Sequence, residues 1–347
     1  MKQSTRHLLM SSLLLTVLAG CAAKIPVRMT LPAETDLSKY RRVSIFDFKG
    51  QGAQQVANAL ETTLMNQRVN GEPYFQMITR SELETILKEQ NLQYQKLAER
   101  FDENSIASIG KLKGVDGLIV GAVDEYQARQ QTRSEQREET NFKTKQKYNV
   151  TYNCLQRTAR VRVTVKFIEV KTARLELSLP LEGNNTAEDC QPSGTSPSVA
   201  DGNDMLRNAT NQMLTGFARK ITPHEVMKEI ELRGKDDDLG FFGGGDEATK
   251  SASVHIGTGV QYATNGNWPL AIGAWEQATQ AKPNSAAAFY NMGVGYEAQG
   301  KLDRAREMYQ KAAQLKSDTL YIKASSVIEQ RIRDAETLRH QTEGRPS

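Results

Sequence analysis

The side chains best suited to catalysis are few and widely separated in this sequence. His224, His255 and His340 have neither the i, i+4 spacing nor the neighbouring cysteine that is typical of a zinc site. The sequence also lacks a G-x-S-x-G nucleophile elbow, a Walker loop and a G-x-G-x-x-G fingerprint. These absences predict a protein that is not an enzyme and that holds no cofactor and no metal.

Two segments carry weaker chemical signals. Asp236-Asp237-Asp238 offers carboxylates to a hard cation, although a solvated charge run is the more usual form of such a segment. Phe241 to Gly245 is rich in glycine, but the Lys-Ser/Thr pair of a phosphate cradle does not follow it. Its phenylalanine pair could pack on the protein itself or dock on a partner. We expect residues 233–251 to be a Gly/Asp-rich linker between two domains.

The cysteine nearest the N-terminus has the most specific chemistry. Lys2 and Arg6 precede an apolar run, Leu8 to Leu18, that is too short to span a bilayer. Leu18-Ala19-Gly20-Cys21 follows and resembles the lipobox of bacterial lipoproteins. The resemblance implies a signal peptide over residues 1–20, after which Cys21 carries a diacylglycerol on its thiol and an acyl chain on its amino group. An ordinary secretory signal with a chance cysteine is the alternative.

Such an anchor would locate the protein in the envelope. Several buried acyl chains on one residue hold a protein stably on a membrane. Ala22 and Ala23 follow the cysteine, without the aspartate that often signals inner-membrane retention, which favours the outer membrane with the protein facing the periplasm. Residues 21–39 are then expected to form a lipidated tether, and no later apolar run is long enough for a membrane helix.

Charge and cysteine content fit this location. Without residues 1–20 the net charge falls from +4 to +2, which makes nucleic acid an unsuitable partner. The remaining length indicates about two domains. With Cys21 lipidated, Cys154 and Cys190 remain as an even pair in an oxidising compartment. We expect these two to form a disulfide rather than to stay free thiols.

A repeat with a period of about 34 residues lies between residues 252 and 317. Six positions match: Gly259, Tyr262, Gly266, Ala271, Trp275 and Ala278 recur as Gly293, Tyr296, Gly300, Ala305, Tyr309 and Ala312. The pattern resembles the tetratricopeptide repeat, whose paired helices meet at small residues and enclose an aromatic side chain. We expect an all-α module over residues 252–341 that ends in a capping helix over about residues 319–340.

The register of this resemblance places Ile256, Val260, Tyr290 and Val294 on the first helix of each repeat, toward a concave groove. Exposed apolar residues of this kind often mark a binding surface, so we expect a partner-binding groove there. Packing of the same face on the capping helix is the alternative. The residues expected in the core between helices are Tyr262, Tyr296, Trp275 and Tyr309.

The middle of the chain, residues 40–232, predicts a three-layer-like α/β (α+β) domain with a mixed sheet. Alternating apolar residues over Val43–Phe48 indicate a strand, and Val56, Leu60 and Leu64 mark the apolar face of a following helix. Further expected elements are a strand over 74–79, a helix capped by Ser81 and Glu84, a short helix at Ile106 and Ile109, strands over 117–123, 160–170 and 173–181, and a helix over 204–220. A hairpin between the last two strands would bring Cys154 and Cys190 together.

This order of elements resembles a known family. Arg80-Ser81-Glu82-Leu83, Leu87-Lys88-Glu89-Gln90 and Gly117 to Gly121, with the lipobox context, are similar to the curli-secretion (CsgG/HfaB) lipoproteins over about residues 40–222. The penicillin-binding-protein activator lipoproteins have a related fold. The resemblance implies a role in envelope assembly or secretion, although a fold alone does not determine a function.

One segment departs from that family. Pore-forming members insert hairpins whose lipid-facing residues are apolar at every second position, whereas residues 127–139 are polar on both faces. A single Arg or Lys at the bilayer midplane costs roughly 2–4 kcal/mol. We therefore expect a solvated hairpin or a disordered excursion here rather than a membrane-inserted segment.

These inferences lead to one expected function. The chain is expected to be an outer-membrane-anchored periplasmic lipoprotein that acts by protein–protein contact, without catalysis, in assembling an envelope structure or a secretion apparatus. Its partners would be other envelope or secretion proteins, the membrane through Cys21, and further copies of itself. Two alternatives stay open: an oligomeric curli-type secretion channel component, and an activator of a cell-wall synthesis enzyme.

Overall fold

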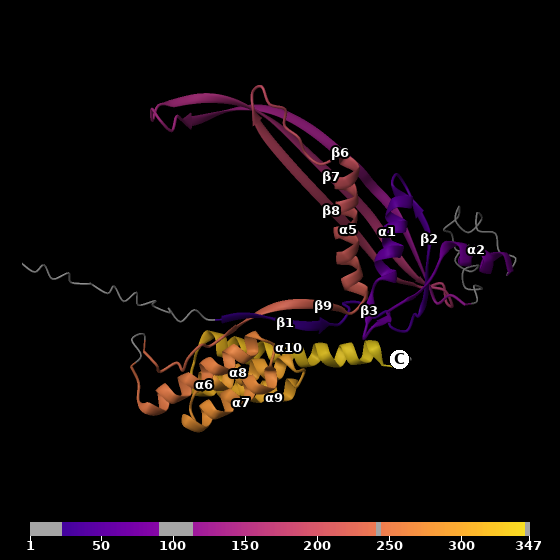
Figure 1. The fold of residues 1–347 in the computed structure, drawn as a ribbon. Coiled ribbons are helices and arrows are strands. Elements are labelled where there is room, and N and C mark those ends of the chain that lie inside the picture. Colours follow the sequence, from indigo (N-terminus) through magenta and orange to yellow (C-terminus); the bar gives the residue numbers. More distant parts are fainter. Residues whose placement is uncertain (1–22, 90–113, 241–243, 344–347) are drawn as a thin grey trace, which may run out of the picture. The chain divides into compact units, whose positions relative to one another are not determined.

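The computed structural model describes residues 23–89, 114–240 and 244–343, and these divide into two compact units (Figure 1). One, called here the sheet unit, comprises residues 30–224 together with the C-terminal residues from 337 onward. The other, called the helical unit, comprises the described residues up to 29 and residues 225–336. The boundary therefore falls before the strand that ends at Leu232, and not at the expected linker.

The sheet unit is built around a five-stranded mixed sheet in the order β5-β2-β6-β7-β8. β2 runs parallel to β5 and β6, whereas β6, β7 and β8 pair antiparallel. The strands are β2 (Arg42–Lys49), β5 (Gln76–Ile78), β6 (Gly117–Thr140), β7 (Lys147–Glu169) and β8 (Leu175–Pro192), and a short hairpin of β3 (Arg68–Val69) and β4 (Glu72–Pro73) precedes β5. The mixed sheet predicted from the sequence is thus present.

Helices cover both faces of the central part of this sheet. α1 (Ala53–Met65) and α5 (Gly202–Ile221) lie side by side on one face, and their apolar side chains share a core with alternate residues of β2, β6 and β7 (Figure 1). α2 (Arg80–Glu89) covers the opposite face, where Leu83 and Leu87 pack with Phe46 and Leu118. Burial of this apolar surface, at about 25 cal/mol per Å², is the main favourable contribution to the packing of the layers.

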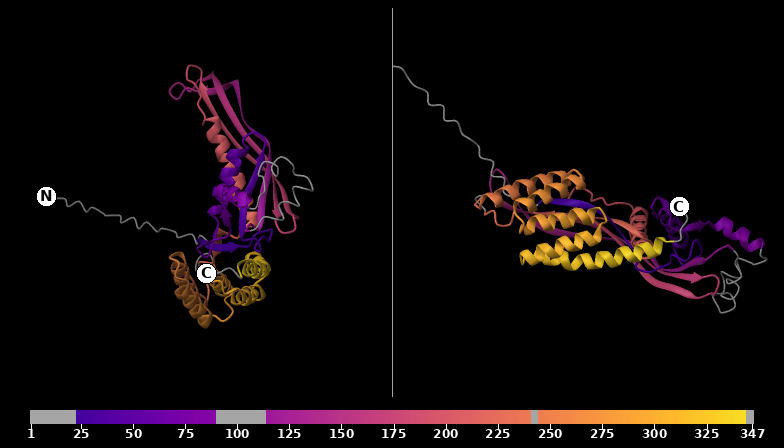
Figure 2. Two further views of the ribbon diagram at one scale, coloured as in Figure 1. Left: turned by 90° about the vertical axis from the view of Figure 1, so that its right-hand side faces the viewer. Right: turned by 90° about the horizontal axis from the view of Figure 1, so that it is seen from below.

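β6, β7 and β8 continue past the N-terminal end of α5 as a three-stranded arm, which we define as residues 129–157 and 184–192 (Figures 1 and 2). Most of its side chains are exposed or half-buried. Cross-strand ion pairs such as Lys147–Glu138 at 2.6 Å, between β7 and β6, support the pairing where no apolar face does. The solvated hairpin expected at residues 127–139 is present, and all three strands are longer than the sequence predicted.

The helical unit combines a two-stranded sheet with a series of helices. β1 (Ala23–Leu31) pairs with β9 (His224–Leu232), and their inward residues share an apolar cluster with the helices. The helices are α6 (Glu247–Thr264), α7 (Trp268–Ala281), α8 (Ala286–Ala298), α9 (Leu302–Leu315) and α10 (Thr319–Thr342). Neither strand was predicted. Residues 23–31 therefore form a paired strand, which corrects the expectation that residues 21–39 are only a lipidated tether.

The sequence repeat corresponds to two helix pairs, α6–α7 and α8–α9. Trp275 of α7 packs on Gly259 of α6, and a Cβ at this glycine would lie 2.2 Å from the indole ring. Tyr309 of α9 packs in the same way on Gly293 of α8, with a corresponding separation of 2.5 Å. Both aromatic side chains are buried. The glycine and the aromatic residue recur together because each ring occupies the space that a side chain on the facing helix would fill.

Two further aromatic residues of the repeat are less buried than expected. Tyr262 is 38% exposed and Tyr296 is half-buried, which corrects the prediction that both lie in the core. Tyr296 of α8 reaches back toward Glu276 on α7, in the preceding helix pair. Tyr262 belongs to the first pair, so no preceding pair of described helices is available to cover it.

Two expectations concern the region after β5. The N-terminus of α2 is capped by Thr79 and Glu82, because the Thr79 amide donates to the Glu82 carboxylate at 2.8 Å and the Glu82 amide donates to the Thr79 hydroxyl at 3.3 Å. This capping box replaces the predicted pair Ser81 and Glu84, two residues further along. The short helix expected at Ile106 and Ile109 lies outside the described residues.

Candidate functional site

Residues 231–238, which begin in β9 and continue beyond it, lie along the helices of their own unit. We call them the docked segment. Side chains from α6, α8 and α10, and from the two loops that follow α7 and α9, form hydrogen bonds or ion pairs with the docked segment. They are Ser253, Lys282, Ser285, Tyr290, Asn291, Lys316, Asp318 and Tyr321. We call this set the inner face. It is the most elaborate polar arrangement among the described residues of the helical unit.

The inner face holds the main chain of the docked segment. The buried Asn291 side chain accepts a hydrogen bond from the Arg233 amide at 2.9 Å and donates one to the Arg233 carbonyl at 2.8 Å. The Tyr290 hydroxyl donates to the Glu231 carbonyl at 2.7 Å, and the Asp236 amide donates to the Ser253 hydroxyl at 3.1 Å. These contacts use backbone groups that every residue other than proline provides. They recognise the backbone of the segment rather than a particular side chain.

Asp236 provides the buried ionic contact of the segment. Its carboxylate lies 2.5 Å from the Lys282 ammonium and also accepts a hydrogen bond from the Ser285 hydroxyl. Ser285 is the N-cap of α8, so the carboxylate sits at the positive end of that helix dipole. Lys282 donates to Asp238 as well. Burial by itself would lower the pKa of Lys282, but its hydrogen bonds with the two aspartates outweigh burial and raise that pKa.

Asp237 contacts side chains that lie one repeat further along the helical unit than those that contact Asp236. Its carboxylate accepts a hydrogen bond from the Tyr321 hydroxyl at 2.7 Å and lies 3.8 Å from the Lys316 ammonium. Burial raises the pKa of Asp237 above its usual value. Lys282 and Lys316 are one repeat period apart and occupy the C-cap positions of α7 and α9. The repeat therefore presents a lysine at equivalent positions to consecutive aspartates.

Arg233 completes the polar contacts of the segment. Its guanidinium lies 2.6 Å from the Asp318 carboxylate and donates to the Tyr321 hydroxyl at 3.1 Å.

Sequence reasoning missed Arg233, Lys282, Ser285 and Asn291. The recurrence of lysine at positions 282 and 316 was the signal that could have identified the inner face.

The predicted groove residues lie beneath this contact. Ile256, Tyr290 and Val294 are buried and Val260 is half-buried, all in the apolar cluster that also contains Ile230 and Leu232 of β9. The prediction of an exposed apolar groove is therefore corrected, because β9 and the docked segment cover that face. The alternative considered from the sequence, packing of this face on the capping helix, is present in part, because the Tyr290 ring lies 5.1 Å from the Tyr321 ring of α10.

The predicted linker also requires correction. Asp236 is 1% exposed and Asp237 is half-buried, so the acidic run is not a solvated charge run. α6 begins at Glu247, inside the span 233–251 that was assigned to the linker, with Asp246 as its N-cap. Phe241 and Phe242 lie outside the described residues.

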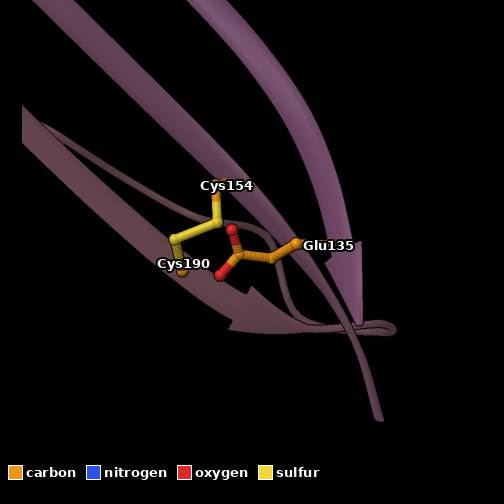
Figure 3. A group of neighbouring side chains, drawn as sticks. All are labelled: Glu135, Cys154 and Cys190. Atoms are coloured by element: carbon orange, nitrogen blue, oxygen red, sulfur yellow. A yellow bond between two sulfur atoms is a disulfide. The ribbon is translucent and has the colours of Figure 1, made fainter. Parts of the chain in front are cut away.

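The arm contains the second chemically distinctive group. Cys154 and Cys190 are directly opposite each other on β7 and β8 and form a disulfide (Figure 3). Glu135 of β6 points toward the two sulfurs, and its carboxylate oxygen lies within 4.8 Å of them. A disulfide provides no thiolate to a metal, and Glu135 is already paired with Arg133 and Arg137. The group is thus a cross-link in a polar sheet rather than a metal centre.

Removing this disulfide is expected to loosen the arm. The cysteines are 36 residues apart, and replacing both by serine should cost about 2–4 kcal/mol, the usual range for a native disulfide. Limited proteolysis of β8 and the loop after it, at equal protease, should become faster in Cys154→Ser/Cys190→Ser than in the parent protein. Equal cleavage rates, or two free thiols in alkylated non-reduced protein, would contradict the cross-link.

The other predicted chemical residues are isolated. His224 lies next to the Thr222 carbonyl, His255 is half-buried in α6, and His340 pairs with Asp36 at 3.4 Å. Cys21 lies outside the described residues. Over the part of the chain that the structure describes, we find no helix with both the length and the apolar character needed to cross a membrane.

Residues 9–199, more than half of the chain, match the family model described as curli production assembly/transport component CsgG. The chain belongs to the CsgG family. The family resemblance seen in the sequence is thus confirmed, and it makes this CsgG-family protein an envelope-associated component of assembly or secretion. Residues 258–338 match a domain of unknown function, DUF6340, which coincides with the helices of the helical unit. No curated protein matches the sequence.

Solved structures that are similar to this chain include two crystal forms of the PelC dodecamer from Paraburkholderia phytofirmans. The form that carries a single substitution is 10% identical, with 56% of this chain and 98% of that chain covered and a TM-score of 0.25. The second form is 11% identical, with 58% and 99% covered and a TM-score of 0.23. Lipoprotein GNA1162 from Neisseria meningitidis is 10% identical, with 51% and 97% covered and a TM-score of 0.23.

Proposed function

We propose that this CsgG-family protein is an outer-membrane lipoprotein, anchored through Cys21 and facing the periplasm, that acts without catalysis as an interaction and assembly component of an envelope structure or secretion apparatus. The observation that carries the proposal is the match of residues 9–199 to an assembly and transport family. The lipobox at Leu18 to Cys21 supports the anchor. The helical unit, in the form of a tetratricopeptide-type module, supplies a surface for protein contact.

The start of β1 limits how far such an anchor can stand from the folded protein. β1 begins at Ala23, two residues after Cys21. An extended chain spans at most about 3.5 Å per residue, so the lipidated cysteine would lie within about 7 Å of this strand. The helical unit, to which the first part of β1 belongs, would then stay close to the membrane surface.

The arm supports contact with proteins rather than insertion into lipid. One of its faces carries Arg129, Gln131 and Gln156, and the opposite face carries Gln130 and Thr132. At roughly 2–4 kcal/mol for each Arg or Lys at the bilayer midplane, insertion of this arm would be strongly unfavourable. The arm is therefore proposed as a periplasmic contact surface.

Replacing Cys21 by serine tests the anchor. The variant should move from the washed membrane fraction to the soluble periplasmic fraction, because it has no thiol to receive a lipid and no described helix could span the membrane in its place. Immunoblotting of the fractions provides the measurement, and Thr30→Ser is a control that should remain in the membrane fraction. Retention of Cys21→Ser in washed membranes would contradict the proposed tether.

Two experiments on the native protein test the assembly role. Capture from crosslinked envelopes should recover a reproducible set of envelope or secretion proteins, and capture of none would contradict the role. Imaging of detergent-extracted particles separates the alternatives, since a closed ring with an open lumen would favour a secretion channel over an interaction component.

A further inference from the structure

The docked segment has the properties of a bound peptide. Residues 233–240 have neither helical nor strand structure, and Asp237 and Asp238 form a turn in which the Leu239 amide donates to the Asp236 carbonyl at 3.1 Å. Leu232 is buried in the apolar cluster of the helices, and beyond it the contacts that hold the segment are hydrogen bonds and ion pairs from side chains of the repeat. We propose that residues 231–238 are an intramolecular ligand that occupies a peptide-binding inner face, and that the partner fitting this face is a protein segment that turns at consecutive acidic residues.

The main-chain contacts favour exchange of one peptide for another. Asn291 binds both the amide and the carbonyl of Arg233, and Tyr290 binds the carbonyl of Glu231. A partner segment in the same backbone conformation offers these same backbone groups whatever its side chains. Gly257 of α6 lies beside the segment, and a Cβ at this position would be in ordinary van der Waals contact with the Gly234 carbonyl oxygen at 3.6 Å.

The charged contacts determine which peptide fits. Lys282 and Lys316 stand one repeat period apart and face consecutive carboxylates, Asp236 and Asp237. The Ser285 hydroxyl adds a hydrogen bond at the first of these carboxylates. The ammonium groups of Lys282 and Lys316 favour a peptide with adjacent acidic residues at these two positions. A basic residue there would be repelled by the lysines and would have no partner for its charge at a buried position.

This arrangement has a regulatory consequence. A ligand tethered by a few residues has an effective concentration in the millimolar range, so a free peptide of equal intrinsic affinity competes poorly. The inner face would thus remain closed until a partner binds more tightly or the segment is drawn away. The inference rests on the proposed role of the helical unit in protein contact, and it concerns when that contact is available.

The test uses a fluorescein-labelled peptide with the sequence of residues 228–240 and the full-length protein in detergent. The parent protein should bind it weakly. The segment variant Asp236→Ser/Asp237→Ser, in which Lys282 keeps Asp238 as a partner, should bind it at least tenfold more tightly by fluorescence anisotropy. A peptide with asparagine at its three aspartate positions should lose at least tenfold in affinity, and adding Asn291→Ala to the segment variant should weaken binding of the parent peptide.

A second version of the protein tests the proposal independently, in case the segment variant does not fold. A protease site inserted after Gly240 keeps every native side chain, and cutting it removes one of the two covalent constraints on the segment. The labelled peptide should then bind at lower concentration than before cutting. A folded segment variant, or a cut protein, that binds no peptide at millimolar concentration would show that the segment is a fixed part of the fold. That result would leave the Cys21 anchor and the family role unaffected, because neither depends on peptide binding.

Discussion

Replacing Trp275 with alanine is expected to lower the free energy of unfolding of the helical unit by about 3–5 kcal/mol. The indole is fully buried, packs on Gly259 and donates from Nε1 to the Ile256 carbonyl at 3.2 Å. Its removal leaves a large cavity between α6 and α7 and removes the hydrogen bond from the indole to the Ile256 carbonyl. Both effects act on the same helix pair, so the loss should exceed that of most single substitutions in this protein.

Tryptophan fluorescence provides a unit-specific measurement of this change. The chain has two tryptophans, Trp268 and Trp275, and both belong to α7. Trp268 therefore reports unfolding of the helical unit in denaturant after Trp275 has been replaced. Val254→Ala, at a residue 67% exposed on α6, is the matched control and should change stability by less than about 0.5 kcal/mol. A loss below about 1 kcal/mol in Trp275→Ala would mean that the helix pair does not enclose this ring.

Replacing Lys282 with methionine is the second change with a large expected effect. The substitution keeps most of the aliphatic stem but removes the ammonium that pairs with Asp236 at 2.5 Å. Asp236 is 1% exposed and would keep the Ser285 hydroxyl as its side-chain partner. Breaking a buried ion pair from one side typically costs about 3–5 kcal/mol because it leaves an uncompensated charge. We expect a loss of this size in denaturant unfolding followed by tryptophan fluorescence.

Two controls separate the charge effect from general disruption. Lys250→Met removes an exposed lysine that pairs with Glu247 at 3.0 Å, and it should cost less than about 1 kcal/mol. The double variant Lys282→Met/Asp236→Leu removes both charges and should recover a large part of the loss, since apolar residues can replace a buried pair at little cost. The interpretation fails if Lys282→Met is no worse than Lys250→Met, or if the double variant is less stable than Lys282→Met.

The docked segment changes where partner contact should be sought. From the sequence, the groove residues Ile256, Tyr290 and Val294 were the natural candidates for a binding surface. In the structure they are core residues, so replacing them should destabilise the helical unit rather than selectively weaken capture of a partner. The exposed arm is the better target for substitutions that alter contacts without unfolding the protein.

The helix pairs and the mixed sheet could be predicted because their patterns are local. Gly259 and Trp275 lie close together in the sequence, on adjacent helices, and the next pair repeats the same contact at Gly293 and Tyr309. Apolar alternation in β2 and the apolar run at the start of β6 indicate buried strands in the same way. In each case nearby residues show the periodicity that their own element requires.

Only the tertiary structure shows that the docked segment covers the inner face and how long the arm is. Asp236 meets Lys282 across 46 residues and Arg233 meets Asp318 across 85, so no periodic pattern within either segment encodes the contact. β1 and β9 pair across some two hundred residues of sequence, so neither segment shows its partner in its local pattern. The arm is polar on both faces and gives no apolar signal for its strands. Pairing with a distant partner, and not local hydrophobic pattern, determines these features.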